Sequence, residues 1–281
     1  MSNTQSTYGT VIAYLGALLI AACDAPVASH EDIAESHEAT VKHDIHWGYG
    51  PENGPAVWAD LNPEYALCRD GREQSPIDIS DPSPAELPSL EANYQAATMR
   101  IIRHEHVVDV IDNGHTIQVN YDEGSTLEVG ESSFELAQYH FHAPSEHTVN
   151  GRHSPMEMHL VHQSESGELA VLGVLIKEGA HNAAFDAVWA ELPDEVGEEI
   201  HLEHVAVNVD DLLPSNRGTF RYRGSLTTPP CSEGVSWFVA VEPIKLSAEQ
   251  IGQFTAIISD NNRPTEPLGE RLVLLVEMPA D

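Results

Sequence analysis

The sequence predicts one domain of mainly β structure (α+β class), with a large, mostly antiparallel central β-sheet and a few short surface helices. The first observation is that 281 residues suit one large domain or two small ones, and that 41% of them are hydrophobic, enough for a sizeable core. The second is a series of short segments that are rich in β-branched residues or alternate between apolar and polar side chains, as strands do. The third is that segments with helical periodicity are few and no internal repeat is found, so a single domain is expected.

The folded domain is expected to begin near His46 with an irregular lead-in. The segment His46–Asp60 is rich in glycine, proline and aromatic residues, and prolines and turn-forming residues continue as far as Ser89. Glycine and proline are the strongest breakers of regular structure. We therefore expect no regular helix in this part of the chain.

Strands and two helices are expected to follow. Arg100–Asp112 is rich in branched residues, and the tight-turn dipeptide Asn113-Gly114 separates it from the alternating segment His115–Tyr121. Further expected strands are Ser133–His142, Met156–His162, Ala170–Lys177, Ser236–Val241 and Arg271–Val276. The helical segments are Ala183–Leu192 and Ala248–Ile258. Ser247 and Gln250 form a capping-box pattern at the start of the second helix.

The first 45 residues are expected to direct and tether the protein. Val11–Ala22 is a short apolar run that fits a signal peptide, and no apolar run reaches the ~20 residues of a membrane-spanning helix. It ends in Ile20-Ala21-Ala22-Cys23, which resembles the lipobox of bacterial lipoproteins, although residues 1–10 contain no Lys or Arg. We expect residues 1–22 to be a signal peptide, 23–45 an acidic tether with a candidate lipid on Cys23, and 46–281 the folded domain. Simple secretion without lipid is the alternative.

The charge balance argues against polyanionic partners. The chain carries 45 Asp and Glu against 13 Lys and Arg, a formal net charge of −32. Such a surface repels nucleic acids and anionic membranes. Because the acidic residues are spread along the chain, the folded surface itself is expected to be acidic. A saline habitat and an ordinary acidic exported protein are both compatible with this composition.

The cysteine count is consistent with export. If Cys23 carries a lipid, Cys68 and Cys231 remain as a pair that an oxidising compartment would join. Two buried free thiols are the alternative.

Three histidines are candidates for a single metal site. His140 and His142 lie two residues apart on an expected strand, so both rings project from one face with Cα atoms about 6.6 Å apart. Such a pair alone is weak evidence. His159 lies 17 positions after His142, on a segment that suits an antiparallel neighbouring strand. A third imidazole leaves the fourth tetrahedral position open, as in catalytic zinc sites. Gln138 and Glu157 share the faces of these ligands and are candidate acceptors for their second ring N–H.

With these histidines in place, the sequence resembles the α-class carbonic anhydrases over about residues 46–276. The motifs that carry the resemblance occur in the family's order: His46-Trp47-Gly48-Tyr49-Gly50, Gln74-Ser75-Pro76-Ile77-Asp78-Ile79, Asn113-Gly114-His115, Gln138-Tyr139-His140-Phe141-His142, Ser145-Glu146-His147-Thr148-Val149, Glu157-Met158-His159-Leu160-Val161-His162, Ser225-Leu226-Thr227-Thr228-Pro229-Pro230 and Asn262-Arg263-Pro264. The resemblance implies an enzyme with the α-carbonic anhydrase fold and a Zn²⁺ cofactor.

The resemblance also implies a role for each matching residue. The zinc ligands are His140, His142 and His159. The catalytic residues are His115 as proton shuttle, Thr227 as the group that orients zinc-bound hydroxide, and Glu146 as the acceptor that fixes the Thr227 hydroxyl. The CO2 and bicarbonate site comprises Val161, Val171, Leu226, Thr227, Thr228, Val235 and Trp237. The water network and the residues behind the ligands are Tyr49, Asn113, Gln118, Gln138 and Glu157. Cys68 and Cys231 match the disulfide of extracellular members.

The implied reaction is zinc-dependent, reversible hydration of CO2 to bicarbonate and a proton. Zinc lowers the pKa of bound water from about 15.7 to about 7, an effect for which carbonic anhydrase is itself the standard example. The resulting hydroxide attacks CO2, and His115 exports the proton because imidazole titrates near neutrality. Two departures are modest. The loop Ala143-Pro144-Ser145 is shorter than in animal members, as in bacterial ones, and Gln118 replaces the more usual Asn.

The expected partners are CO2 and bicarbonate, with no nucleic acid; a membrane tether through lipidated Cys23 and a homodimer are further candidates. The expected location is outside the cytoplasmic membrane, either periplasmic or anchored there. One alternative function is a non-catalytic binding module, which the complete set of three ligand histidines disfavours. Another is a zinc-buffering protein that uses the tether histidines His30, His37 and His43.

The identity of the mature N-terminus tests the export prediction. Mass spectrometry of the full chain expressed in a bacterium with its own leader is expected to find Cys23 as the first residue, with a lipid attached. A mature chain that begins at another small residue, with no lipid mass, would establish simple secretion instead.

Overall fold

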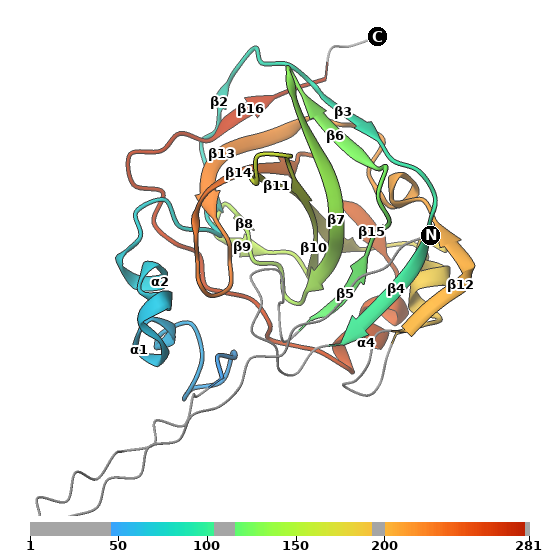
Figure 1. Ribbon diagram of the computed structural model, residues 1–281, viewed down its shortest axis with the longest axis horizontal. Helices are drawn as coiled ribbons and strands as arrows, with labels where there is room; N and C mark the ends of the chain where they lie inside the picture. Colours follow the sequence, from blue (N-terminus) through green and yellow to red (C-terminus); the bar gives the residue numbers. More distant parts are fainter. Residues whose placement is uncertain (1–45, 104–115, 193–199, 279–281) are drawn as a thin grey trace, which may run out of the picture. The chain divides into compact units, whose positions relative to one another are not determined.

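The computed structural model describes residues 46–103, 116–192 and 200–278. Within these residues, 13 strands form one large sheet (Figure 1). Their order across the main path is β12 (Ile200–Val207), β4 (Ala97–Arg103), β5 (Ile117–Asn120), β7 (Ser132–His142), β10 (Met156–Gln163), β11 (Leu169–Glu178), β14 (Glu233–Ala240), β13 (Thr219–Ser225), β16 (Leu274–Val276) and β2 (Ser83–Pro84).

Three more strands join this sheet off the main path. They are β15 (Ile244–Leu246) beside β11, β6 (Thr126–Val129) beside β7, and β3 (Leu90–Asn93) beside β6. A second sheet consists of β1 (Asp78–Ile79), β8 (Thr148–Val149) and β9 (Arg152–His153). Most neighbouring strands are antiparallel, which confirms the expected fold class. The pairs β11–β14, β11–β15 and β16–β2 are parallel, so the large sheet is mixed.

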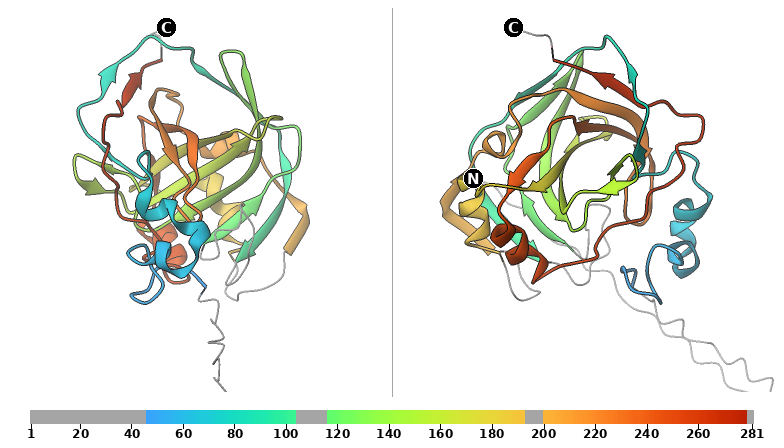
Figure 2. Two further views of the ribbon diagram at one scale, coloured as in Figure 1. Left: turned by 60° about the vertical axis from the view of Figure 1, so that its left-hand side comes forward. Right: turned by 180° about the vertical axis from the view of Figure 1, so that it is seen from behind.

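The helices are short, as expected. They are α1 (Trp58–Leu61), α2 (Leu67–Asp70), α3 (Asp186–Trp189) and α4 (Ala248–Thr255), with 3-10 turns η1 (Pro63–Tyr65), η2 (Ala183–Phe185) and η3 (Val209–Leu212). Figures 1 and 2 show α1 and α2 together at one edge of the described fold and α4 at another. The capping box of α4 is confirmed, because Ser247 accepts from the Gln250 N–H and Gln250 accepts in return. No helix in the described ranges is long and apolar enough to cross a membrane.

Three details of the expected elements are corrected. The lead-in contains the single-turn helices α1 and α2 rather than irregular chain alone; Pro63 disfavours a helical Asn62 and ends α1 after one turn. The helix expected over Ala183–Leu192 is split into η2 and α3 and ends at Trp189. The last strand begins at Leu274 because a turn, closed by the Arg271 N–H to the Leu268 carbonyl, precedes it.

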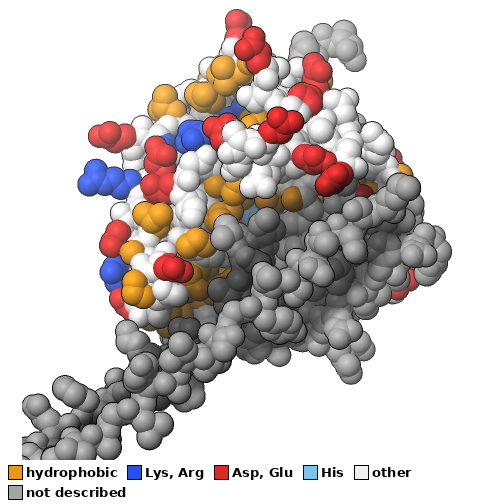
Figure 3. Space-filling model, viewed as in Figure 1, with side chains coloured by type: hydrophobic (Ala, Val, Ile, Leu, Met, Phe, Trp, Pro, Cys, Tyr) orange, Lys and Arg blue, Asp and Glu red, His pale blue; other side chains and the backbone are white. Residues whose placement is uncertain are grey.

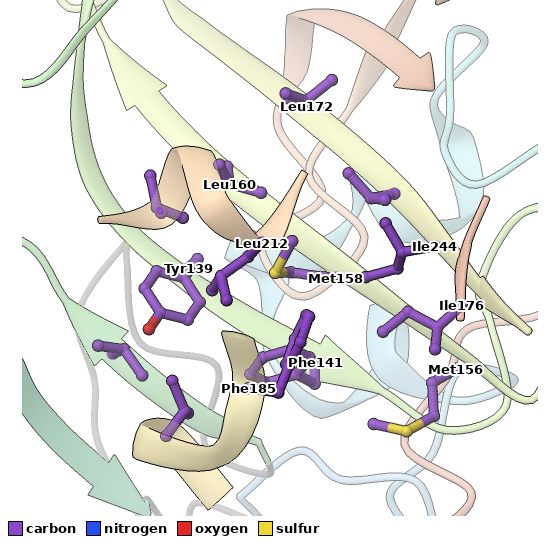
Figure 4. Close-up of a cluster of buried hydrophobic side chains, with 14 of the residues drawn as sticks. Tyr139, Phe141, Met156, Met158, Leu160, Leu172, Ile176, Phe185, Leu212 and Ile244 are labelled. Carbon is purple, nitrogen blue, oxygen red and sulfur yellow. The ribbon is translucent and has the colours of Figure 1, made fainter. Parts of the chain in front are cut away.

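Strand alternation gives the sheet two different faces. On one face, Tyr139 and Phe141 of β7 and Met158 and Leu160 of β10 pack in the main apolar core with Phe185 of η2 (Figure 4). On the other face, a smaller apolar cluster contains Ile77, Ile79, Val161, Val171, Tyr222, Val235, Trp237, Val239 and Val273. Neighbouring residues of a strand point to opposite faces. The histidines that alternate with the core residues of β7 and β10 therefore project toward the smaller cluster.

The charge expectation and the cysteine pairing can both be followed in the structure. Figure 3 shows acidic side chains distributed over the described part of one face, with few basic ones between them.

Cys68 and Cys231 form a disulfide that joins positions 163 residues apart. This bond connects α2 to the loop between β13 and β14. The predicted pairing is present in the structure.

A buried histidine on β10 predicts how stability depends on pH. His162 is fully buried, with Nε2 2.9 Å from the Tyr94 hydroxyl, and burial lowers its pKa from 6.5 to about 4. The unfolded chain therefore takes up a proton at His162 as the pH falls below about 6.5, whereas the folded chain does so only near 4. Since each pKa unit corresponds to about 1.4 kcal/mol, this residue should remove up to about 3 kcal/mol of stability between these pH values.

The variant His162→Gln tests this expectation by urea denaturation at several pH values. We expect the unfolding free energy of the variant to fall less between pH 6.5 and 4 than that of the unchanged chain. This comparison does not depend on the absolute stability of the variant. His181→Gln is the control, because His181 is exposed beside Asp186. An equal pH dependence for His162→Gln and the unchanged chain would contradict the assignment.

Candidate metal centre

Two neighbouring strands bring three histidines together. In the antiparallel pairing of β7 with β10, His159 lies opposite His140 and Glu157 lies opposite His142. The ring centroids are 5.0 Å apart for His140 and His142, 5.3 Å for His140 and His159, and 4.7 Å for His142 and His159. One ligand atom from each ring lies within 4.8 Å of the others. The arrangement expected from strand alternation is therefore present.

Each of the three rings has a polar neighbour at one nitrogen. His140 Nδ1 lies 2.8 Å from the side-chain oxygen of Gln138, and His142 Nδ1 lies 2.6 Å from the backbone oxygen of Asn261. His159 Nε2 lies 3.0 Å from Glu157 Oε1. Because the oxygens beside His140 and His142 accept hydrogen bonds, they favour the tautomers that leave Nε2 of both rings with a lone pair. The carboxylate beside His159 Nε2 attracts a proton to that nitrogen without a hydrogen bond between the described atoms, which leaves Nδ1 for a metal. A metal ion needs those lone pairs.

The chemistry of these nitrogens fits zinc. His142 Nε2 is buried and has no hydrogen-bond partner among the described residues. Burial, followed by the neighbouring histidines, lowers the pKa of His140 well below its ordinary value, and burial likewise lowers that of His142. Both rings therefore remain neutral and able to bind a metal. Three imidazole nitrogens are the protein ligands of one type of catalytic zinc site, in which the fourth position is left to water or substrate.

The fully buried carboxylate of Glu157 organises the residues behind the ligands. Its Oε2 accepts the backbone N–H groups of Glu146 at 2.9 Å and His147 at 2.8 Å, and its Oε1 lies 2.7 Å from His147 Nδ1. Although burial opposes ionisation, His147 and His159 hold the pKa of Glu157 well below its usual range. His147 Nε2 lies 2.7 Å from the Tyr222 hydroxyl. His147, Glu157 and His159 also form a possible ligand group by distance, but the contacts of His147 and Glu157 with each other and with Tyr222 favour a supporting role.

Glu146 lies directly beside the ligands. Its Oε1 accepts the Arg263 backbone N–H at 2.8 Å. Its Oε2 is buried without a hydrogen-bond partner in the described part of the chain, 3.5 Å from His142 Nε2. One carboxylate oxygen is thus fixed by the backbone and the other is available as an acceptor.

The loop that carries Thr227 and Thr228 is held at several points. Both residues are almost fully buried, and the Cys231 N–H donates to the Thr228 carbonyl at 2.8 Å. The Leu226 N–H donates to the Ser232 carbonyl at 3.0 Å, and the disulfide ties Cys231 to Cys68. These contacts give the two threonines a defined position beside the histidines.

Arg263 connects the lead-in to this site, and sequence reasoning gave it no role. Its guanidinium is buried and donates to Gln74 Oε1 and the Ser75 carbonyl at 2.8 Å each, and to the Cys68 carbonyl at 2.7 Å. Its own backbone N–H holds Glu146. The motif Asn262-Arg263-Pro264 marked the position, but no local pattern shows that an arginine is buried. The Asn261 backbone acceptor was missed because a carbonyl leaves no signal in the sequence.

A pocket lined by two of the three histidines, His140 and His159, has a polar and an apolar side. Its polar lining includes Gln138, His140, His159, Gln163, Thr227 and Thr228. Its apolar lining consists of Ala137, Val161, Leu169, Val171, Leu226 and Trp237. The ring of Trp237 lies 4.9 Å from that of His159. Val235, which was expected in the apolar wall, packs in the cluster with Val161 and Val171 rather than lining this pocket.

Two of the remaining predicted site residues, Gln118 and Tyr49, lie in the described part of the chain. Gln118 is buried on β5 opposite His140, and its amide nitrogen donates to Asn120 Oδ1 at 2.6 Å. Tyr49 is half-buried and packs edge-on against Trp47 and Trp58. Asn113, His115 and Cys23 lie outside the described residues.

Comparison with known proteins gives consistent results. A family model described as eukaryotic-type carbonic anhydrase matches residues 53–276. The chain is 41% identical over 235 residues to a carbonic anhydrase of Nostoc sp., covering 82% of this chain and 86% of that protein. It is 39% identical over 237 residues to a carbonic anhydrase of Pectobacterium carotovorum, covering 84% and 93%. The solved α-carbonic anhydrase of Thermovibrio ammonificans, in complex with the inhibitor sulfanilamide, superposes with a TM-score of 0.76 at 44% identity, covering 82% and 98%.

The contact between Gln138 and His140 predicts a change in metal affinity. Replacing Gln138 with alanine removes the acceptor that orients the His140 ring. Loss of such a partner typically weakens metal binding about 10- to 100-fold. We expect a loss of zinc affinity in this range for Gln138→Ala, measured by competition with a chromophoric chelator.

The control is Gln163→Ala, which removes an amide from the lining of the same pocket without an observed contact to a ligand histidine among the described residues. Its zinc affinity should match that of the unchanged chain. Equal affinities for both variants and the unchanged chain would show that Gln138 does not support the ligand.

Proposed function

The chain belongs to the eukaryotic-type carbonic anhydrase family and has carbonic anhydrase activity, and we propose that it performs zinc-dependent, reversible hydration of CO2 in the pocket of His140, His142 and His159. The observation that carries this proposal is the convergence of three buried imidazoles, two of which, His140 and His159, line a pocket with one polar and one apolar side. Zinc held there would supply a nucleophile at neutral pH by lowering the pKa of water to about 7, as carbonic anhydrases classically illustrate.

The apolar side of the pocket suits CO2. Val161, Val171, Leu226 and Trp237 offer no hydrogen bond from their aliphatic or ring surfaces in the pocket, and Trp237 Nε1 is already engaged by the Ser225 carbonyl at 2.9 Å. A nonpolar substrate loses little by leaving water for such a wall. Its position beside the histidines would hold the carbon atom close to the attacking oxygen.

Thr227 and Glu146 are proposed to orient the attacking oxygen. A hydroxyl that gives its proton to a carboxylate keeps its oxygen lone pairs for accepting. Glu146 Oε2 lacks a partner among the described residues, so it is available for the Thr227 proton. Thr227 would then accept from the attacking oxygen and fix its direction, and the N–H of Thr227 with Thr228 would contact the bicarbonate product.

Proton export is proposed to use His115. Imidazole has an ordinary pKa near 6.5 and exchanges protons with buffer at neutral pH. Tyr49, Asn113 and Gln118 are proposed to order the water between this residue and the site. Gln118 supports the proposal because it lies opposite His140 and has a buried side-chain oxygen without a partner in the described residues.

We further propose that the enzyme acts outside the cytoplasmic membrane, in the periplasm or anchored through a lipid on Cys23. The apolar run of residues 11–22 before this cysteine supports export, and the Cys68–Cys231 disulfide suits an oxidising compartment. The strongly acidic composition would favour a tether over direct adsorption to an anionic membrane surface.

Stopped-flow CO2 hydration by the zinc-loaded full chain tests the proposed function. We expect hydration that stops when zinc is removed, returns when zinc is added and is inhibited by sulfanilamide, which binds the Thermovibrio ammonificans relative. His140→Ala should lose most of the activity together with its zinc. Full activity in metal-free protein would contradict the proposal.

The role of His115 is tested separately by His115→Ala. Because general acid–base groups contribute up to about 10²–10⁴-fold, we expect kcat to fall at least about tenfold in weak buffer, with a smaller change in kcat/KM. Added imidazole should restore kcat, since it replaces the lost proton acceptor. His153→Ala, at an exposed histidine of β9, is the control. A kcat for His115→Ala equal to that of the control would assign proton export to another group.

A further inference from the structure

A second cavity lies on the face of the sheet opposite the metal centre. Leu172 of β11 lines this cavity, whereas its neighbour Val171 lines the metal pocket. Adjacent residues of a strand point to opposite faces, so the two pockets are separated by the sheet itself. The second cavity has a volume of about 230 Å³. An apolar cavity of about 150 Å³ already admits benzene, so there is room for a short hydrocarbon chain.

The walls of this cavity are mostly apolar. Leu90, Ala92, Leu127, Leu172, Val174, Leu213, Pro214 and Ala240 contribute to them. Of these, Leu127 and Val174 are completely buried in the main core. The cavity therefore reaches the packed core, and residues of the loop 213–218 complete its lining.

The lining also includes the polar residues Asp210, Asn216, Arg217 and Thr219, of which Arg217 is the one cation. Arg217 lines the cavity, and its Nη2 donates to Asp210 Oδ1 at 2.7 Å. Its Nη1 is buried and has no hydrogen-bond partner among the described residues. A buried charged donor without an acceptor is costly, and native proteins rarely leave one in place. Because the chain has only 13 Lys and Arg, a guanidinium N–H without an acceptor beside an apolar cavity is an uncommon use of a basic residue.

We propose that this cavity is a second binding site, which takes a small amphiphile with one carboxylate and an unbranched apolar tail, such as a medium-chain fatty acid. The tail occupies the apolar walls, and the carboxylate accepts from Arg217 Nη1. Guanidinium donors form charge-assisted hydrogen bonds with carboxylates, and Arg217 retains its bond to Asp210 through the other nitrogen. No residue of the metal pocket takes part.

Octanoate is the probe, titrated into the zinc-loaded full chain below its micelle concentration and followed by backbone amide NMR. We expect saturable shifts at Gly218 and Ala240, which line the cavity, with a saturation curve independent of any shift at Thr227 and Thr228, where a carboxylate can also enter the proposed bicarbonate site. 1-Octanol, with the same tail and no carboxylate, should bind at least about tenfold more weakly, because it lacks the charge-assisted bond.

Two variants test the two parts of the site. Arg217→Gln should weaken octanoate binding at least about tenfold, while Arg152→Gln, at an exposed arginine of β9, should leave it unchanged. Ala92→Leu should also weaken binding at least tenfold by filling the cavity while retaining Arg217, so the proposal stays testable if Arg217→Gln does not fold. Shifts confined to Thr227 and Thr228, no saturable shifts at all, or equal binding to Ala92→Leu and the unchanged chain would overturn the proposal.

Discussion

The metal centre depends on the hydrogen bonds and charge contacts that surround the buried carboxylate of Glu157. An ionised carboxylate inside a protein is tolerated only when donors and cations surround it. Here the donors are the backbone N–H groups of residues 146 and 147 and the ring of His147, with the ring of His159 3.0 Å away. Satisfying this one group therefore positions a ligand ring and, through the adjacent backbone, Glu146. Any change that leaves the carboxylate without these donors would disturb both.

The same sheet serves two purposes because its faces have different chemistry. Tyr139 and Phe141 alternate with His140 and His142 along β7, and Met158 alternates with His159 on β10. The aromatic and aliphatic side chains anchor the strands in the core, and the rigid strands in turn fix the spacing of the histidines. Sites built on strands hold their geometry more firmly than sites on loops. The loop with Thr227 is restrained by the disulfide to Cys68, and Arg263 in turn holds the Cys68 carbonyl.

Much of the site was predictable because its signals are local. His140, His142 and Gln138 follow from strand alternation, and the capping box of Ser247 and Gln250 from a four-residue pattern. The partners that escaped prediction come from long range. The Asn261 carbonyl, the buried Arg263 and the parallel pairing of β11 with β14 each join positions far apart in the chain. Side-chain periodicity shows which face a residue occupies, but it does not show which distant backbone group will meet it.

The central claim is that three histidines alone bind one metal ion and leave its fourth position to water or substrate. X-ray absorption at the zinc edge of the full chain, combined with a metal count, tests this most directly. The account predicts one zinc per chain, with four nitrogen or oxygen neighbours at about 2.0–2.1 Å, three of them imidazole. A sulfur neighbour at about 2.3 Å, a fourth imidazole from the tether histidines, or an unchanged spectrum for His159→Ala would contradict it.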